Sequence, residues 1–331
     1  MVTYAIRRLM LIPVTMVLLS LLFFFMLRTI PGDFVDVLFQ EGGSGGYNNV
    51  QGEHHEGGQT TQEAYQEQMR DRFGLSDPAH VQYVRWVSHM LRGDFGDSYL
   101  AKKTALQVLK DRLPATIELG LLGLVGSILL GIPLGILSAR YPESWIDNAL
   151  RLFSIGGLSV PAFVTAAIII VILSKEFQWI PPDYVPFTED PWKNLQNMIF
   201  PAIVVSYTSA APLMRLTRSQ MLEVLSQDYI RTARAKGLPE QRIFYGHALR
   251  NAMLPIITVI GLSLDRLVAG SVIVEVVFGI NGMGAALVRA AAERDFPVMQ
   301  LFAMVLGLTV MTVNLLVDLM YGIIDPRIRL S

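Results

Sequence analysis

The chain of 331 residues has no cysteine and few charged residues. Without cysteine, neither a disulfide framework nor a cysteine-ligated metal site is possible, and the redox compartment is not indicated. Charged residues make up only 17% of the sequence, whereas 52% is hydrophobic and the mean hydropathy is +0.43. Soluble domains usually carry about 25% charged residues. The composition therefore predicts an integral membrane protein.

Motifs for catalysis and nucleotide binding are also absent from the sequence. The five histidines form no HExxH pair, and no GxxxxGK[ST] phosphate loop occurs, so this route to ATP binding is excluded. Glu53, His54, His55 and Glu56 stand together, but no two of them have a rigid helical spacing, and we interpret them as a solvated, flexible patch. We expect a protein that is not an enzyme and binds no cofactor or metal.

Six apolar stretches are long enough to cross a membrane, which takes about 20 helical residues. They are Leu9–Leu27, Ala115–Ala139, Leu152–Ser174, Ile199–Met214, Leu254–Val277 and Val298–Ile324. The first stretch lacks a small-residue cleavage site, which favours an uncleaved anchor over a signal peptide. The fourth is polar and contains two prolines, so we expect it to pack inside a bundle. The prediction is an all-α, polytopic membrane helix bundle of about six transmembrane helices.

The distribution of arginine and lysine predicts the orientation in the membrane. Arg7, Arg8, the tail and the very basic connection between the fourth and fifth stretches fall on one side when six spans are threaded, which makes that side the cytoplasm. We expect a multi-pass protein of the cell (inner) membrane with both termini cytoplasmic. Its predicted regions are residues 1–29 (cytoplasmic amino terminus and first span), 30–113 (extracytoplasmic, with a flexible Gly-rich insert at 41–58) and 114–331 (core, with a cytoplasmic loop at 215–253).

The basic cytoplasmic loop carries the most information. Asp228 suits the first turn of a helix, Gly237 can take the left-handed conformation that ends one, and Pro239 suits the start of the next. Between these residues lie Tyr229, Arg231, Thr232, Ala233, Arg234, Ala235 and Lys236. A shallow, basic surface suits docking into a groove of another protein. Anchoring to anionic lipid is the alternative, and the helix–Gly–Pro–helix pattern favours docking.

Polar residues within the apolar stretches are candidates for a transport path, because ionisable groups at membrane depth usually face the bundle interior or water. They are Glu118, Asp265, Arg266, Glu275, Asn314, Asp318 and Tyr321. The last three are spaced i, i+4 and i+7 on one helix face, which suits either a path or a helix interface. Gly131 and Gly135 favour close helix packing over gating.

Several segments resemble the dipeptide/oligopeptide/nickel branch of ABC-importer permeases. The loop segments RTARAKG (Arg231–Gly237) and HALRNAMLP (His247–Pro255) are similar to the cytoplasmic "EAA" loop of that family. Further similarity lies in YAIRR (Tyr4–Arg8), RTIPGD (Arg28–Asp33), RGDFGDS (Arg92–Ser98), RLPAT (Arg112–Thr116) and the ending from Asn314 to Arg329. Together these segments resemble the first of the two paired permeases and cover nearly the whole chain. The chain departs from the family pattern at Arg231, where the general consensus has glutamate, and after Glu275, where a proline is missing.

The resemblance implies a fold and a set of partners. The fold is that of a type I ABC importer permease, and residues Tyr229 and Arg231–Gly237 belong to its coupling helix. The expected partners are a homologous second permease, two ATPases that bind ATP and Mg²⁺, an extracytoplasmic solute-binding protein and the lipid bilayer, with no nucleic acid. The expected solutes are di- and oligopeptides, with nickel chelates, glutathione-like compounds or oligosaccharides as alternatives. An ion-gradient-driven transporter and an intramembrane enzyme are the other classes considered, and the sequence shows no clear internal repeat or nucleophile–base set for them.

Overall fold

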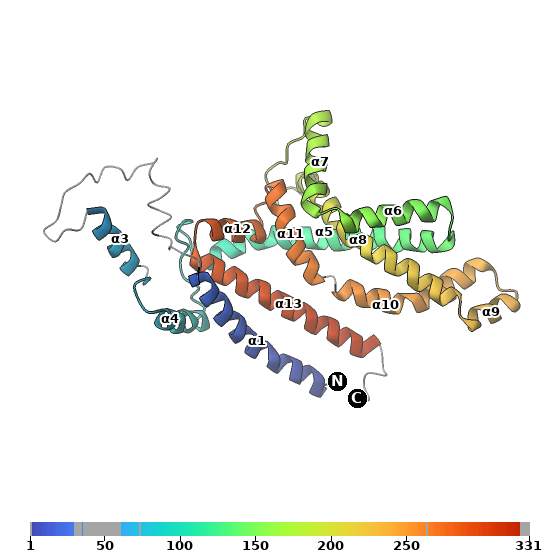
Figure 1. Ribbon diagram of the computed structural model, residues 1–331, viewed down its shortest axis with the longest axis horizontal. Coiled ribbons are helices and arrows are strands. Elements are labelled where there is room, and N and C mark those ends of the chain that lie inside the picture. Colours follow the sequence, from blue (N-terminus) through green and yellow to red (C-terminus); the bar gives the residue numbers. More distant parts are fainter. Residues whose placement is uncertain (1, 30–34, 36–60, 73, 263, 325–331) are drawn as a thin grey trace. The chain divides into compact units, whose positions relative to one another are not determined.

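The computed structural model describes residues 2–29, 35, 61–72, 74–262 and 264–324, and its regular elements are helices (Figure 1). They are α1 (Val2–Thr29), α3 (Thr61–Arg72), α4 (Ala79–Leu91), α5 (Ala105–Arg140), α6 (Trp145–Ser159), α7 (Ala162–Phe177), α8 (Pro191–Leu225), α9 (Asp228–Ala235), a π-helical segment (Arg242–Ala248), α10 (Leu249–Leu262), α11 (Leu264–Phe278), α12 (Met283–Ala292) and α13 (Phe296–Ile324). The first compact unit consists of Met1–Leu9, Arg112–Ala285 and Thr309–Ser331, and the second of Met10–Asp111 and Ala286–Leu308. The predicted all-α class is confirmed.

Membrane-spanning length is reached by four helices of the described residues, and by up to seven spans if each bent pair of helices is one span. The four are Leu9–Thr29 of α1, α5, α8 and Phe296–Val317 of α13. Helix α8 is longer than its predicted apolar stretch and continues through Pro201 and Pro212 over 35 residues. As expected for a polar span inside a bundle, it buries many side chains, among them Asn197 and Ser206.

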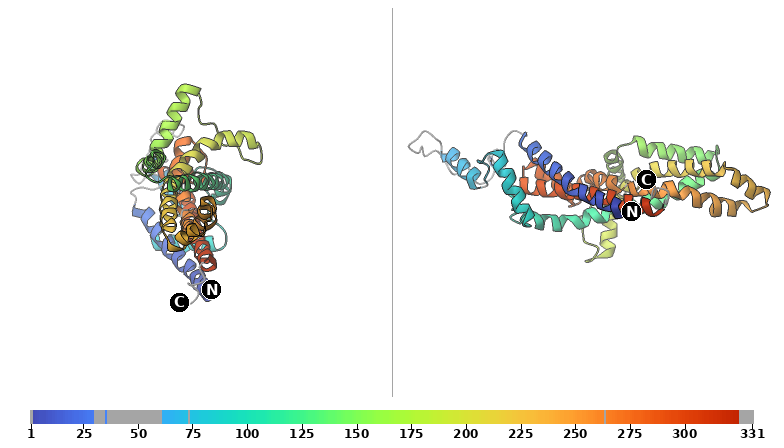
Figure 2. Two further views of the ribbon diagram at one scale, coloured as in Figure 1. Left: turned by 90° about the vertical axis from the view of Figure 1, so that its right-hand side faces the viewer. Right: turned by 90° about the horizontal axis from the view of Figure 1, so that it is seen from below.

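The third predicted span, Leu152–Ser174, is not one straight helix. It divides into α6 and α7, whose axes differ by 106° (Figures 1 and 2). The break lies at Val160, which has extended backbone (φ −91°, ψ 120°) and precedes Pro161. A proline disfavours the helical conformation of the residue before it and lacks the N–H needed for the helix ladder, which explains the bend. Hydropathy alone reports the length of an apolar run and not its straightness.

Helices α5 and α8 approach each other closely in the first unit. A methyl group added to Gly131 would lie 3.0 Å from Cβ of Leu213, and one added to Gly135 would lie 2.6 Å from Cβ of Thr217 and 2.7 Å from the carbonyl oxygen of Met214. Only glycine fits at the second position without displacing α8. The packing interpretation of Gly131 and Gly135 is confirmed, because small residues allow two helix backbones to approach closely.

The second unit contains α4, along which Val81, Val84, Val87 and Leu91 recur at helical spacing. A different face of this helix packs on α1. Phe24 of α1 contacts Tyr83 and Trp86 with ring centroids 5.2 and 5.9 Å apart, and the hydroxyl groups of Ser20 and Tyr83 are 2.9 Å apart. Val84 and Leu91 remain 64% and 80% exposed within the chain.

Candidate functional site

Helix α9 follows the carboxyl end of α8 and is the centre of the candidate site (Figure 1). Asp228 lies in its first turn, where the helix dipole favours an acidic side chain. At the other end Gly237 has φ +75°, its N–H donates to the carbonyl of Arg234 (2.9 Å), and the N–H of Leu238 donates to the carbonyl of Ala233 (3.3 Å). This pair of bonds is a Schellman motif. The predicted start and end of the helix are therefore both confirmed.

The chain restarts at Pro239, as predicted, but a π-helical segment stands before α10. The carbonyl of Pro239 accepts hydrogen bonds from the N–H groups of Arg242 (2.9 Å) and Ile243 (3.2 Å). The π-helical turn covers Arg242–Ala248 and continues directly into α10. The pattern of residues predicts the restart but not the wider turn.

The underside of α9 is anchored by one apolar side chain. Ile230 is fully buried and belongs to a cluster with Met221 of α8 and with Ile243 and Phe244 of the π-helical segment. Burying an isoleucine contributes about 1.5–3 kcal/mol. Ala233 is half-buried against the same cluster, so it faces inward more than the sequence suggests. The loop thus has a fixed place on the first unit.

The outer surface of α9 is shallow and basic. It is formed by the exposed residues Tyr229, Arg231, Thr232, Arg234, Ala235, Lys236 and Gly237. Arg231 pairs with Asp228 (3.2 Å) and Arg234 with Glu240 (2.8 Å), whereas the Tyr229 hydroxyl accepts a hydrogen bond from Asn251 (2.8 Å). Exposed ion pairs contribute only about 0–1 kcal/mol, so a partner can displace these acids at little cost. We call these seven residues the α9 surface.

Two of the candidate path residues, Glu118 and Glu275, contact polar groups of the first unit. Glu118 on α5 is half-buried and accepts a hydrogen bond of 2.8 Å from the hydroxyl of Tyr184, in the segment between α7 and α8. Burial, together with this bond to Glu118, raises the pKa of Tyr184 above its ordinary value, so the phenol stays a donor.

Glu275 on α11 is fully buried and holds the start of α12. Its Oε1 accepts from the Thr116 hydroxyl (2.8 Å), and its Oε2 accepts from the N–H of Ala285 (3.0 Å). The same hydroxyl accepts from the N–H of Met283 (2.7 Å). A carboxylate is favoured at a helix amino terminus, where N–H groups lack partners within the helix. Gly282 leaves room for it, since an added methyl group would lie 2.4 Å from the carboxyl carbon.

Of the remaining path candidates, Asn314 has a described side chain, which is half-buried on α13. The structure describes the backbone of Asp265, Arg266, Asp318 and Tyr321 but not their side chains. Whether any of the candidates line a path stays a prediction.

Sequence reasoning missed a buried acid near the end of α5. Asp147 is the third residue of α6, is completely buried, and binds Arg218 of α8 through two bonds of 2.7 Å each. Its local signal was present, because Ser144 and Asp147 have the Ser-x-x-Asp spacing of a capping box. The Ser144 side chain does accept from the N–H of Asp147 (3.2 Å). The partner Arg218, 71 residues away, has no signal in the sequence.

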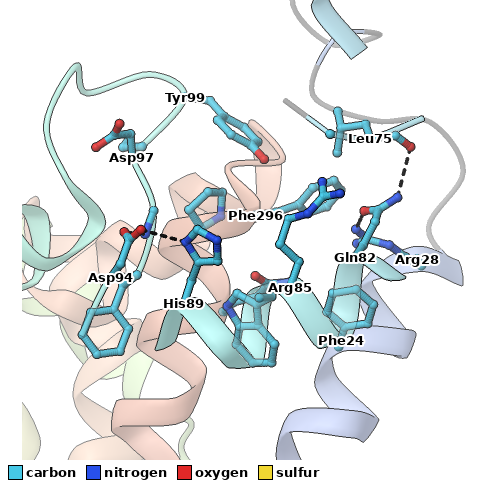
Figure 3. Close-up of a pocket in the computed structure, with 17 residues that line it drawn as sticks. Phe24, Arg28, Leu75, Gln82, Arg85, His89, Asp94, Asp97, Tyr99 and Phe296 are labelled. Atoms are coloured by element: carbon cyan, nitrogen blue, oxygen red, sulfur yellow. Dashed lines mark hydrogen bonds and ion pairs between the residues drawn. The ribbon is translucent and has the colours of Figure 1, made fainter. Parts of the chain in front are cut away.

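The second unit has a cavity of about 490 Å³ that is lined by charged and aromatic side chains from α1, α4, the following loop and the start of α13 (Figure 3). Arg28 lies over the ring of Phe24 at 4.2 Å and donates to Gln82. His89 and Asp94 are 2.8 Å apart, and this bond to His89 holds the pKa of Asp94 below its ordinary value. Arg28 and the His89–Asp94 pair thus have polar contacts within the cavity.

The loop that borders the cavity carries the RGDFGDS segment. Gly93 and Gly96 both have φ +80°, which explains the two glycines. Asp295 is buried and accepts hydrogen bonds from the Ser98 hydroxyl and from the N–H of Tyr99 (3.3 Å). Burial raises the pKa of Asp295, although these bonds oppose the shift. The segment thus has a structural role within the second unit.

Within the described residues, no group of three or more histidine, aspartate or glutamate side chains could hold a metal ion. The patch of Glu53, His54, His55 and Glu56 lies outside these residues.

Comparison of the sequence with known proteins identifies the family of this chain. Residues 131–330 match the family described as the binding-protein-dependent transport system inner membrane component. The chain is 37% identical over 334 residues to the oligopeptide transport system permease protein AppB of Bacillus subtilis (strain 168), which covers 99% of this chain and 100% of that protein. It is 40% identical over 293 residues to the probable D,D-dipeptide transport system permease protein DdpB of Escherichia coli (strain K12), covering 82% and 86% of the two chains.

A solved structure has the same fold. The crystal structure of an amino acid ABC transporter with histidines aligns with a TM-score of 0.51 and 16% identity over 65% of this chain and 93% of that chain. Apolar helices of spanning length, a basic loop with a defined helix, and relatives that match over nearly the full length agree with one another. The chain therefore belongs to the binding-protein-dependent transport system inner membrane component family, the permease subunits of ABC importers.

Proposed function

We propose that this chain forms one half of the translocation path of an ATP-driven importer of short peptides. A homologous second permease forms the other half, two ATPase subunits bind ATP and Mg²⁺, and an extracytoplasmic binding protein delivers the solute. The support for the solute class is that the two relatives named above carry oligopeptide and D,D-dipeptide transport in their descriptions. The chain itself hydrolyses nothing in this proposal.

The α9 surface is the proposed contact with the ATPase. Two observations together carry this assignment: one side of α9 is buried in the first unit, and the opposite side is exposed. Ile230 anchors the helix in the first unit, while the α9 surface stays exposed. A docking helix has to be held firmly by the membrane subunit, because otherwise a push from its partner would move the loop alone. The Schellman ending stiffens the same segment.

The orientation follows from this assignment. We propose that α9 and both termini are cytoplasmic and that residues 30–113 are extracytoplasmic, in the inner membrane. The positive-inside rule supports this orientation, since Arg215, Arg231, Arg234, Lys236 and Arg242 all lie in the loop at 215–253. The core region 114–331, with its coupling loop at 215–253, would then carry the motion from the ATPase to the path.

The proposal is tested by assembling the complex. The chain is expressed with its second permease and ATPases, purified, and reconstituted in vesicles with the binding protein, and ATP hydrolysis and uptake are measured with candidate peptides. Peptide-dependent hydrolysis and uptake are expected. A response to nickel chelates, glutathione-like compounds or oligosaccharides would keep the importer and replace the solute. A chain that never associates with ATPases would contradict the proposal.

Variants of the α9 surface locate the contact. Ala235→Trp places a large side chain on an exposed position of α9 and should block ATPase association. Ala292→Trp, at an exposed alanine that ends α12, is the matched control and should leave association unchanged. Gly237→Pro removes the N–H that bonds Arg234 and forces φ away from +75°, so it should uncouple hydrolysis from uptake. Normal association and uptake in both α9 variants would refute the docking assignment.

A further inference from the structure

Asp147 lies at a junction of three elements of the first unit. Arg218 of α8 donates to it through Nε and Nη2, each at 2.7 Å. The Ser138 hydroxyl at the end of α5 and the N–H of Glu143 (2.9 Å), in the turn before α6, donate to the same carboxylate. One buried acid thus joins the end of α5, the start of α6 and the carboxyl half of α8.

The same end of α8 leads directly to α9. Arg218 precedes the first residue of α9 by ten positions. Between them Met221 is fully buried in the cluster that anchors Ile230, and Ala139 of α5, next to Ser138, belongs to that cluster too. The polar junction at Asp147 and the apolar cluster beneath α9 therefore both join the end of α5 to the carboxyl half of α8.

The geometry of the ion pair makes the connection stiff. A guanidinium that donates two parallel bonds to one carboxylate fixes direction as well as distance, which a lysine ammonium cannot do. Asp147 is fully buried and the Arg218 side chain is 21% exposed, so water has little access to replace either partner. A buried pair of this kind is poor support for stability by itself, because both charges lose hydration, but breaking it is unfavourable.

We propose that Asp147 and Arg218 are positioning residues for energy coupling, which make α6 and the end of α5 follow α9 when the ATPase moves it. The inference rests on the proposed function of the α9 surface. Without the pair, α9 and the end of α8 still receive the push, but α6 does not move with them. ATP is then hydrolysed with less solute carried.

The first experiment measures solute transported per ATP hydrolysed in the reconstituted complex. Arg218→Lys keeps the charge and loses the two-bond geometry, and Asp147→Asn keeps the shape and loses the charge. Both should retain ATP hydrolysis and lower the transported solute per ATP by about fivefold or more, the usual lower range of coupling between sites. Arg151→Gln is the matched control, since Arg151 approaches the same carboxylate only to 4.0 Å and is half-exposed. Its ratio should equal that of the wild type.

The outcomes separate this inference from simpler roles. A lower yield or melting temperature of the variants with an unchanged ratio would show that the pair is only a structural brace, and would overturn the inference. A wild-type complex that assembles but never couples hydrolysis to uptake would overturn the proposed function itself. If Arg151→Gln lowered the solute transported per ATP as much as Arg218→Lys does, the coupling role would not be specific to Arg218.

A second measurement does not depend on transport. Because the chain has no cysteine, a single pair of spin labels can be placed at Ala149→Cys on α6 and Gln241→Cys beside α9, both exposed positions. In the wild-type complex the distance between the labels should stay the same with and without ATP, and Arg218→Lys should broaden its distribution. A wild-type change larger than one helical turn, about 5.4 Å, would show that α6 does not follow α9.

Discussion

Thr116 offers a sharp test of how α11 and α12 are joined. Its hydroxyl donates to Glu275 and accepts from the N–H of Met283, so it belongs to two hydrogen bonds at once. Thr116→Val keeps the shape of the side chain and removes both bonds. Thr116→Ser keeps the hydroxyl and is the matched control.

The cost of Thr116→Val follows from the groups left behind. Glu275 loses a hydrogen bond to a charged group, which is typically about 1.5–3 kcal/mol, and the buried N–H of Met283 loses its partner, at about 1–3 kcal/mol. The two costs together are about 2.5–6 kcal/mol. With about 2–4 °C per kcal/mol for 150–250 residues, the melting temperature should fall by about 5–24 °C. Thr116→Ser removes one methyl group and should cost about 1 kcal/mol.

The assay is thermal unfolding of the purified complex, followed by tryptophan fluorescence, for the wild type and both variants. The reasoning predicts a clear order, with Thr116→Val well below Thr116→Ser. Equal melting temperatures for the two variants would refute the view that the hydroxyl bridges α5, α11 and α12.

Three further predictions concern packing and titration. Gly135→Ala should destabilise the complex or prevent its folding, because the added methyl group meets α8. The control Gly120→Ala, on the same helix, meets nothing within 4 Å and should be tolerated. Thermal unfolding of both variants measures the difference. Asp295 has a raised pKa in the folded state, so its contribution to stability is full below its unfolded pKa of about 3.9 and is lost as pH rises through the folded value. The melting temperature of Asp295→Asn relative to the wild type should therefore increase between pH 4 and pH 7, and a difference independent of pH would contradict the assignment. Tyr184→Phe removes the donor to Glu118 and should cost about 1 kcal/mol, measured as a shift in the same unfolding curve.

The ends of α9 could be predicted from the sequence because local chemistry decides them. Gly237 ends the helix through a backbone conformation that other residues avoid, and Asp228 starts it through the helix dipole. The α6–α7 bend also had a local signal at Pro161, which a hydropathy profile does not register. These features depend on residues a few positions apart.

The roles of Glu275 and Asp147 could not be predicted in the same way. Thr116 is 159 residues from Glu275, and Arg218 is 71 residues from Asp147. Sequence reasoning named Glu275 as a candidate path or helix-interface residue but could not say what its carboxylate contacts. A buried acid is defined by what the fold brings to it, and for both residues that partner comes from a distant helix.

The length of α8 has a consequence for the electrostatics of the basic loop. Residues 194–214 carry no charged side chain, and 21 helical residues span about 32 Å, close to the ~30 Å hydrocarbon core. From Arg215 the same helix continues to Leu225, which adds about 15 Å. This overhang exceeds the Debye length of ~8 Å at physiological ionic strength. In the proposed orientation, and with α8 near the membrane normal, α9 therefore begins beyond the hydrocarbon core, where the lipid charge is largely screened and a soluble partner can compete for the exposed ion pairs of Arg231 and Arg234.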